Sequence, residues 1–283
     1  MSATARTLAD ALESARAMGL DRLDAQLLAA HVLGRPRAWV IANTDVPLEA
    51  DVSATLGALA TRRAAGEPLA YLTGQREFFG LSLAVSPDVL VPRPDSETLV
   101  EWALDLLDGP LGHREAPRVI DLGTGSGAIA LAIKHNCPRA EVHATDRSAS
   151  ALDIARHNGA RLGLDVCWHV GAWWSAVPGL CFDLVLSNPP YVAPGDRHLQ
   201  DLRHEPAIAL TPERDRGDGM ADIERIVAGA SAHVASGAWL LIEHGADQST
   251  AVRDWLRQHG FPAPVTRQDL AGRERVSGGA YAY

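Results

Sequence analysis

The run Asn188-Pro189-Pro190-Tyr191 is the most specific chemical signal in this sequence. The side chain of Asn188 carries an amide oxygen that can accept a hydrogen bond. The Pro189 carbonyl is a second acceptor, because the prolines fix the chain so that it can face a cavity. Two adjacent acceptors can hold both hydrogens of a planar NH2 group, and Tyr191 can stack on that group. The run therefore predicts a site that reads an amide, an adenine or a cytosine.

Such a site suits the transfer of a group to nitrogen. When both hydrogens of the NH2 group are held, the lone pair of its nitrogen points away from the two acceptors. A donor molecule placed on that side can transfer a group to the nitrogen. A general base is not required before transfer, since the proton can leave afterwards. The site would work by positioning and electrostatics.

A second signal is the glycine loop Gly123-Thr124-Gly125-Ser126-Gly127, which follows an apolar stretch at 119–122 and opens a helix expected at about 127–135. Glycines let the backbone pass close to a ligand, and a helix N-terminus favours polar or anionic groups. The loose dinucleotide fingerprint also fits, so the loop alone is compatible with either a nicotinamide cofactor or S-adenosylmethionine. Asp146, 19 residues after Gly127, can accept both hydroxyls of the ribose that both cofactors carry.

A pair of adjacent tryptophans, Trp173 and Trp174, follows the third expected strand. One of them can stack on an adenine ring, but tandem tryptophans are as often packing residues. The sequence gives both roles equal weight.

Composition narrows the classes of partner. The 283 residues carry a formal net charge of −9, whereas proteins that hold nucleic acid by its phosphates usually carry a basic balance. No direct nucleic-acid binding is therefore expected. No metal site is expected either, because the three cysteines form no CxxC pair and His198 and His204 near Glu205 match no standard ligand spacing. The sequence shows no signal peptide and no run of 18 apolar residues, so it predicts a cytoplasmic protein without a membrane segment.

The elements that position these residues fall into two patterns. Helical spacing dominates the first 65 residues, and residues 69–95 read as a short hairpin and a proline-rich stretch. Residues 108–113 are the best candidate for a linker. Beyond them strands and helices alternate: strands are expected at 119–122, 142–146, 166–170, 182–187, 239–243, 262–267 and 276–283, with helices at 148–161, 220–235 and 248–259. This alternation predicts an α/β fold with a doubly wound, mostly parallel sheet, which binds ligands at the carboxyl ends of its strands.

With these residues in place, the sequence resembles the release factor glutamine methyltransferase (PrmC/HemK) family of class I S-adenosylmethionine-dependent methyltransferases. The glycine loop and the run at 188–191 carry the general likeness. The narrower likeness rests on further motifs in the right order: Pro68-Leu69-Ala70-Tyr71-Leu72-Thr73-Gly74, Arg76-Glu77-Phe78, Val91-Pro92-Arg93-Pro94-Asp95-Ser96-Glu97, Gly219-Met220-Ala221-Asp222-Ile223 and Glu243-His244-Gly245. The likeness runs from about Pro68 to the C-terminus and extends more weakly through the N-terminal helices.

The resemblance implies a reaction and a domain plan. The family methylates the side-chain amide nitrogen (N5) of the glutamine in the Gly-Gly-Gln motif of bacterial class 1 peptide chain release factors, here release factors 1 and 2. S-adenosyl-L-methionine is the methyl donor, S-adenosyl-L-homocysteine the product, and no metal takes part. The implied plan is an N-terminal helical substrate-recognition domain at 1–66, a hairpin and proline-rich connector at 67–95, and a seven-stranded methyltransferase domain at 96–283. A monomer is expected.

The resemblance also implies roles for individual residues. Asn188 and Pro189 are the expected catalytic residues. The expected cofactor-binding residues are Gly123, Thr124, Gly125, Ser126, Gly127, Asp146, Trp173 and Asn188. The expected substrate-binding residues are Asn188, Pro189, Pro190, Tyr191, Arg93 and Glu97, although a structural ion pair is as well supported for the last two. The sequence departs from the family pattern at Ala172, where an acidic residue is usual, and at His204, where an aromatic residue is usual.

Other functions fit parts of the sequence. An adenine-N6 methyltransferase would use the same run at 188–191, but such enzymes usually need base flipping and a basic strand-binding surface. A nicotinamide dehydrogenase rests on the loose glycine fingerprint alone, and Lys134 is the only lysine, so no Tyr-x-x-x-Lys pair exists. A non-catalytic ribosome-associated binding protein would leave the run at 188–191 without a chemical task. Glutamine methylation is the preferred prediction.

Overall fold

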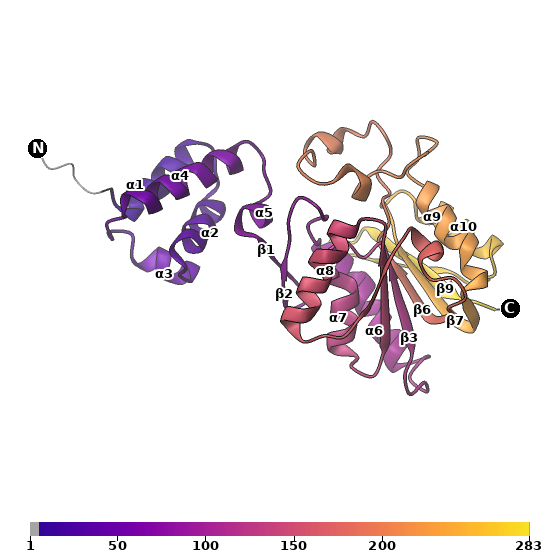
Figure 1. The fold of residues 1–283 in the computed structure, drawn as a ribbon. Coiled ribbons are helices and arrows are strands. Elements are labelled where there is room, and N and C mark those ends of the chain that lie inside the picture. Colours follow the sequence, from indigo (N-terminus) through magenta and orange to yellow (C-terminus); the bar gives the residue numbers. More distant parts are fainter. Residues whose placement is uncertain (1–5, 283) are drawn as a thin grey trace, which may run out of the picture. The chain divides into compact units, whose positions relative to one another are not determined.

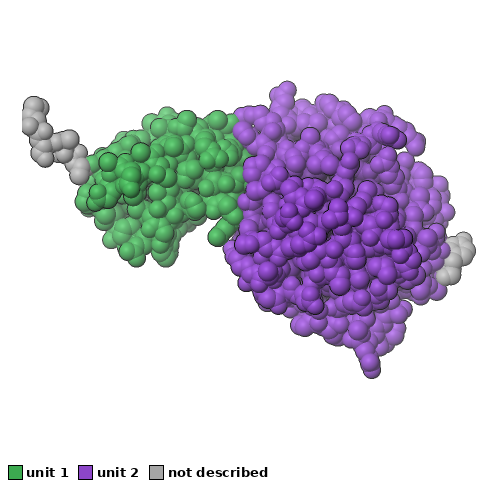
Figure 2. Space-filling model, in the orientation of Figure 1, with its two compact units in different colours: residues 1–75 green, residues 76–283 purple. Residues whose placement is uncertain are grey.

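The computed structural model describes residues 6–282. The chain forms two compact units, which meet in the sequence between Gln75 and Arg76 (Figure 2). Each unit has hydrophobic core clusters of its own. The two units are therefore described separately.

Unit 1, residues 6–75, is helical (Figure 1). Its helices are α1 (Leu8–Ala17), α2 (Arg22–Leu33), α3 (Arg37–Ala42), α4 (Ala50–Ala64) and α5 (Leu69–Thr73). Thr7 caps α1, since its hydroxyl accepts a hydrogen bond from the Asp10 amide while the Asp10 carboxylate accepts one from the Thr7 amide. Gly34 ends α2 in the left-handed conformation, which glycine adopts without steric cost. Leu8, Leu28 and Val40 are fully buried in the core of this unit.

A two-stranded hairpin begins at the last residue of unit 1 and otherwise belongs to unit 2. Its strands are β1 (Gln75–Phe78) and β2 (Leu81–Ala84). The side chain of Asn158 ties β2 to the rest of the unit. Its Oδ1 accepts from the Ala84 amide at 2.7 Å, and its Nδ2 donates to the carbonyls of Ala84 and Ser126, each at 3.0 Å. Asn158 is fully buried. One side chain thus connects the hairpin with the glycine loop.

The main sheet of unit 2 has the strand order β5-β4-β3-β6-β7-β9-β8 within the described residues (Figure 1). The strands are β3 (Arg118–Leu122), β4 (Glu141–Asp146), β5 (Cys167–Val170), β6 (Phe182–Ser187), β7 (Val234–Glu243), β8 (Val265–Gln268) and β9 (Glu274–Ala280). The pairs from β5 to β7 are parallel, and β9 runs antiparallel to both β7 and β8. Strand order reverses beside β3, which is where ligands bind in sheets of this type.

Helices cover both faces of this sheet. The α-helices are α6 (Glu97–Asp108), α7 (Ala128–Asn136), α8 (Ala149–Leu162), α9 (Ala221–Gly229) and α10 (Ser249–Gln258). Short 3-10 turns are η1 (Pro94–Ser96), η2 (Trp173–Ala176), η3 (Arg197–Gln200), η4 (Ala207–Ala209) and η5 (Ala230–Ala232). Neighbouring residues of β3 pack in opposite directions: Val119 joins the core under α6 and α7, and Ile120 joins the core under α9 and α10. This two-sided burial explains why Val119, Ile120 and Leu122 are all apolar.

The predicted fold class, a doubly wound and mostly parallel seven-stranded sheet with an N-terminal helical bundle and a connecting hairpin, is confirmed. Residues 108–113 are not a linker between units, because they form a turn inside unit 2 with Leu111 buried. The helix expected at 220–235 is shorter. It ends at Gly229, where the Trp174 ring packs so closely that a Cβ would lie 2.2 Å from it, and β7 begins at Val234. No helix among residues 6–282 combines the length and apolar character that crossing a membrane requires.

Replacing Asn158 by alanine should destabilise unit 2 by about 2–4 kcal/mol, because a buried backbone group left without a partner costs about 1–3 kcal/mol. Asn136→Ala is the matched control, since Asn136 is exposed and makes one bond, to the Ala132 carbonyl. Urea unfolding followed by tryptophan fluorescence measures both variants, and Trp39 is the only tryptophan before residue 76. Equal stability of the two variants would contradict the connecting role of Asn158.

Candidate active site

A pocket of about 1030 Å³, counted to its open mouth, lies at the carboxyl ends of β3, β4 and β6. Each of these strands delivers one polar element to it: the glycine loop follows β3, Asp146 ends β4, and Asn188 follows β6. The pocket lies wholly within unit 2.

The pocket contains most of the residues expected at a site, but not all. Those that line it are Arg93, Gly123, Thr124, Gly125, Ser126, Asp146, Trp173, Asn188 and Pro190. Those that do not are Glu97, Gly127, Pro189 and Tyr191. Gly127 instead begins α7 in the left-handed conformation.

The glycine loop is held against the end of β4. The amides of Gly123 and Thr124 both donate to the Thr145 carbonyl, at 2.9 and 2.8 Å. Gly123 has a φ of +78°, and a Cβ there would lie 2.9 Å from the ring of Trp173. The glycine is therefore required twice, by its backbone conformation and by the tryptophan packed on it. A Cβ at Gly125 would meet no atom within 4 Å, so the loop is open at that residue.

Asp146 is oriented by backbone amides. Its Oδ2 accepts from the Gly125 amide and its Oδ1 from the Ser148 amide, both at 2.9 Å. Burial raises the pKa of Asp146, and these two amides oppose the shift. A carboxylate has about four acceptor sites, so each oxygen keeps capacity for a hydroxyl in the pocket. Ser148 caps α8 with its own hydroxyl, which leaves the Asp146 side chain available to a ligand.

A second carboxyl group lies beneath the loop. Asp121 is 1% exposed, and its Oδ2 accepts from the Thr124 hydroxyl at 2.5 Å. Its Oδ1 and the hydroxyl of Thr145 are buried without a partner among the described residues. Burial raises the pKa of Asp121 to about 7. The base of the glycine loop therefore carries an acceptor whose hydrogen bonding the described residues do not complete.

The two adjacent tryptophans have different surroundings. Trp173, with a φ of +50°, lines the pocket together with the buried Asp222. Trp174 donates to the Ile226 carbonyl at 2.9 Å and stacks on His233 at 4.7 Å. Only Trp173 is placed to contact a ligand, and Trp174 is a packing residue.

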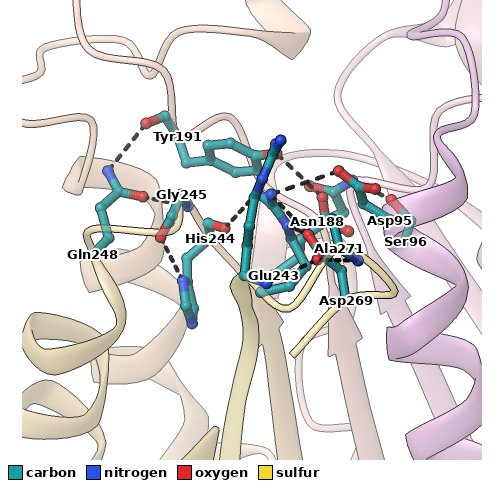
Figure 3. A network of polar contacts seen from close by, with 12 residues as sticks. Asp95, Ser96, Asn188, Tyr191, Glu243, His244, Gly245, Gln248, Asp269 and Ala271 are labelled. Carbon is teal, nitrogen blue, oxygen red and sulfur yellow. Dashed lines mark hydrogen bonds and ion pairs between the residues drawn. The ribbon is translucent and has the colours of Figure 1, made fainter. Parts of the chain in front are cut away.

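The run at 188–191 is linked to groups on three other segments through Asn188 and Tyr191 (Figure 3). Its Nδ2 donates to the Ser96 hydroxyl at 3.1 Å. The Tyr191 hydroxyl donates to Glu243 Oε1 at 3.2 Å, and the Tyr191 carbonyl accepts from Gln248 Nε2 at 3.1 Å. Glu243 is 1% exposed, and burial raises its pKa to about 7. Burial also raises the pKa of Tyr191, so its hydroxyl keeps its proton and acts as a donor.

Arg93 and Glu97, the two substrate-binding residues expected from the proline-rich stretch, have different surroundings in the structure. Arg93 lines the pocket and forms an ion pair with Glu205, whose other oxygen accepts from the Val91 amide at 3.0 Å. Glu97 instead accepts from the Phe79 amide at 3.1 Å and so anchors the hairpin. Ala172, where the family pattern has an acid, lines the pocket. His204 does not line the pocket, whereas the neighbouring Pro206 does.

Sequence reasoning placed none of Ser96, Asp121, Asp222 and Glu243 in the site, and it expected Asp95 or Ser96 only as the cap of the following helix. Three of them stand inside motifs that carried only the family resemblance. Asp121 and Glu243 share a signal that could have found them, since each is an acidic residue in the last two positions of its strand and directly follows apolar residues. Burying a charge is costly unless it is hydrogen-bonded or used, so such residues are candidates for function.

Comparison with known proteins identifies the family. The PrmC N-terminal domain model matches residues 5–74, and the methyltransferase small domain model matches residues 96–210. A release factor glutamine methyltransferase of Bordetella pertussis is 52% identical over 264 residues, covering 92% of this chain and 95% of the relative. One of Burkholderia pseudomallei is 51% identical and covers 99% of both chains. The chain belongs to the release factor glutamine methyltransferase family. The adenine-N6 alternative is not favoured.

Solved structures share the fold with this release factor glutamine methyltransferase family member. The N-terminal domain of human METTL16, in complex with SAH, superposes with a TM-score of 0.53 at 18% identity and covers 84% of this chain and 85% of that one. The Thermus thermophilus 16S rRNA N2 G1207 methyltransferase, in complex with AdoMet and guanosine, gives 0.54 at 20% identity and covers 73% and 49%. At this identity the likeness concerns the fold alone.

Replacing Gly123 by alanine should destabilise unit 2 by about 2–4 kcal/mol. The left-handed backbone costs a side chain about 1–2 kcal/mol, and the contact with Trp173 adds an overpacking cost of about 1–3 kcal/mol. Gly163→Ala is the control for the backbone part, because Gly163 has a φ of +67° and nothing within 4 Å of its Cβ position. Urea unfolding should show the larger loss for Gly123→Ala. Equal losses would mean that Trp173 moves aside freely.

Proposed function

We propose that this family member transfers a methyl group from S-adenosyl-L-methionine to the side-chain amide nitrogen (N5) of a glutamine in peptide chain release factors. The target is the glutamine of their Gly-Gly-Gln motif, and S-adenosyl-L-homocysteine is released. The observation that carries the proposal is the orientation of Asn188. Its NH2 group is bound to Ser96, so its Oδ1 is left as an acceptor in the same pocket as the glycine loop and Asp146.

The residues of the pocket fit the methyl donor. Asp146 has free acceptor capacity for the two ribose hydroxyls, and the glycine loop leaves room for close approach at Gly125. Trp173 lines the wall next to Ala172 and offers an aromatic face. Thr124 and Ser126 complete the loop, and Gly127 shapes the start of α7. When bound, the sulfonium group of this cofactor supplies an electrophilic methyl.

Asn188 and Pro189 would hold the substrate by its nitrogen. Asn188 Oδ1 and the Pro189 carbonyl each accept one hydrogen of the glutamine NH2, which turns the nitrogen lone pair toward the methyl donor. An amide nitrogen is a weak nucleophile, so orientation and stabilisation of the developing positive charge must supply the acceleration. The N–C bond would form as the S–C bond to the methyl group breaks, and one proton would then pass from the nitrogen to water. Pro190 lines one side of the glutamine pocket and Arg93 another. Tyr191 stands behind Pro190 and is held by its bond to Glu243.

Unit 1 would recognise the protein substrate. A glutamine in a loop is chemically the same as any other glutamine, so the choice of release factors 1 and 2 needs contacts away from the reacting atom. Binding energy from such contacts can raise the rate as well as the affinity. Unit 1 has its own core and matches the PrmC N-terminal domain. We expect the enzyme to act as a monomer on the release factor.

The experiment that tests the proposal combines the enzyme with S-adenosylmethionine labelled in its methyl group. Separate samples contain a release factor and DNA, and mass spectrometry locates the label. Label on the Gly-Gly-Gln glutamine supports the proposal. Label on adenine, or on another residue of the factor, would overturn it. Within residues 6–282 no group of three or more His, Cys, Asp or Glu side chains is placed to hold a metal ion, and the assay is run with and without a chelator.

Asn188→Ala should lower kcat by about 10²–10³-fold, the range seen when one preorganised polar partner of a transition state is removed. The fold should persist, because Asn188 is only half-buried. Methyl transfer to the release factor and calorimetry of cofactor binding measure the two effects. Asn43→Ala, which removes an asparagine of unit 1, is the control. More than a tenth of wild-type turnover in Asn188→Ala would show that the amide does not hold the substrate.

A shortened chain that begins at Gly74 keeps β1 whole and removes the core of unit 1. If unit 1 docks the factor, kcat/KM should fall by at least about 100-fold on intact release factor, since two or three lost contacts amount to about 3 kcal/mol. On a short Gly-Gly-Gln peptide it should change little. Both substrates are assayed in parallel. Equal losses on the two would mean that unit 1 only stabilises unit 2.

A further inference from the structure

The amide of Asn188 has two ends of similar shape, and only one of them can hold a substrate NH2 group. With Oδ1 toward the pocket the side chain is an acceptor, and with Nδ2 toward the pocket it would oppose the substrate's own donors. A half-turn about the last side-chain bond exchanges them. The structure has to contain a group that selects between the two orientations.

Ser96 is that first group. It is 4% exposed and lies at the N-terminus of α6, yet its side chain makes no capping hydrogen bond to the helix. A serine at this position ordinarily caps its helix. Here the hydroxyl accepts from Asn188 Nδ2 at 3.1 Å, and the carboxylate of Glu243 is its other polar neighbour. The hydroxyl is therefore used for Asn188 rather than for the helix.

Glu243 decides which way the Ser96 hydroxyl donates. A carboxylate only accepts hydrogen bonds, so the single hydrogen of Ser96 must point to Glu243 and the lone pairs of Ser96 remain for Asn188. Glu243 Oε1 also accepts from the Tyr191 hydroxyl, and its Oε2 is buried without a partner among the described residues. Figure 3 shows Glu243 at the end of its strand among Asn188, Tyr191, Asp95 and Ser96.

The charge of Glu243 is balanced within the same cluster. Arg275, on the neighbouring strand β9, attracts it, and Asp95 repels it. The Arg275 guanidinium also contacts Asp269 at 3.1 Å and Asp95 at 3.5 Å, and donates to the His244 carbonyl at 3.2 Å. A buried carboxylate with this partner nearby can remain ionised at the cost of a raised pKa.

We propose that Glu243, acting through the Ser96 hydroxyl, is a positioning residue that fixes the Asn188 amide with its oxygen toward the substrate nitrogen. The proposal rests on the proposed function, because it assigns a task within the same reaction. Neither Glu243 nor Ser96 needs to touch the reacting atoms. In this arrangement Asn188 Nδ2 donates to the Ser96 hydroxyl, and the Ser96 hydroxyl donates to the Glu243 carboxylate.

Protonation of Glu243 should release this orientation. A neutral carboxyl can donate to Ser96, whose hydrogen is then free to point at Asn188 and to favour the turned amide. Burial raises the pKa of Glu243 to about 7. The charged and titratable groups that face it are Arg275, Asp95 and Tyr191, and Tyr191 remains protonated in this range. The ordered form therefore exists above about pH 7 and is lost as the pH falls through that value.

Nuclear magnetic resonance tests the orientation without any turnover. The chain has four asparagines, Asn43, Asn136, Asn158 and Asn188, so selective 15N labelling gives few side-chain amide signals, and Asn188→Ala assigns the relevant one. In the wild-type protein this signal should shift with a midpoint near pH 7. The shift should be absent in Glu243→Gln. A signal of Asn188 that does not change between pH 5.5 and 8.5 would overturn the proposal, even if every variant failed to fold.

Kinetics test the consequence for catalysis. Ser96→Ala and Glu243→Leu should each lower kcat by about 10–100-fold with little change in the KM for the release factor. We expect kcat/KM of the wild type to fall below pH 7. Glu243→Gln keeps an acceptor for Ser96, so it should recover most of kcat at pH 8 and lack this fall. Ser187→Ala is the matched control, because its fully buried hydroxyl donates to the Leu122 carbonyl at 2.7 Å and not to Asn188.

The outcomes separate this proposal from the proposed function. If the wild type labels the glutamine but Ser96→Ala and Glu243→Leu behave like Ser187→Ala, the positioning role is wrong and the function stands. If the wild type labels no glutamine, the function fails, and the resonance of Asn188 still decides the orientation. Melting curves and cofactor calorimetry accompany each variant. An equal loss in cofactor affinity and kcat would indicate a purely structural role and would also overturn the proposal.

Discussion

Parallel alignment of β4, β3, β6 and β7 is the constraint on which the site depends. Parallel strands bring their carboxyl ends to one edge, where the chain must leave the sheet and its next residues are released from the ladder. Each strand end therefore contributes a short irregular segment: the glycine loop after β3, Asp146 at the end of β4, and Asn188 after β6. Segments distant in sequence meet there without any need for a long connecting loop.

The same edge concentrates buried carboxyl groups. Asp121 ends one apolar stretch and Glu243 ends another, and burial raises the pKa of both to about 7. Each has one oxygen without a partner among the described residues. A well-packed apolar residue would be less costly at either position. Two buried carboxyl groups next to one pocket lower the stability of the fold. Such groups are expected where they align the neighbouring polar atoms of a functional site.

The repeating parts of the fold were predictable from sequence, because local patterns determine them. Buried strands read as apolar runs, and the loop after β3 reads as glycines, since only glycine fits a φ of +78° against the Trp173 ring. The division of labour between Trp173 and Trp174 was not predictable, because it depends on Ile226 and His233 in a distant helix and turn. Ser96 was missed for a related reason. Its position predicts a helix cap, and its actual partners lie far along the chain.

The reversed direction of β9 affects the order in which parts of unit 2 fold. Because β9 runs against its neighbours, its first residues rather than its last reach the carboxyl edge, and Arg275 meets Asp95 from the opposite end of unit 2. Contacts across so much intervening chain form late, since loop closure must precede them. The glycine loop and β4 are near neighbours in sequence and can associate early. We expect a folding chain to place the Asp146 carboxylate beside the glycine loop before the surroundings of Asn188 become rigid.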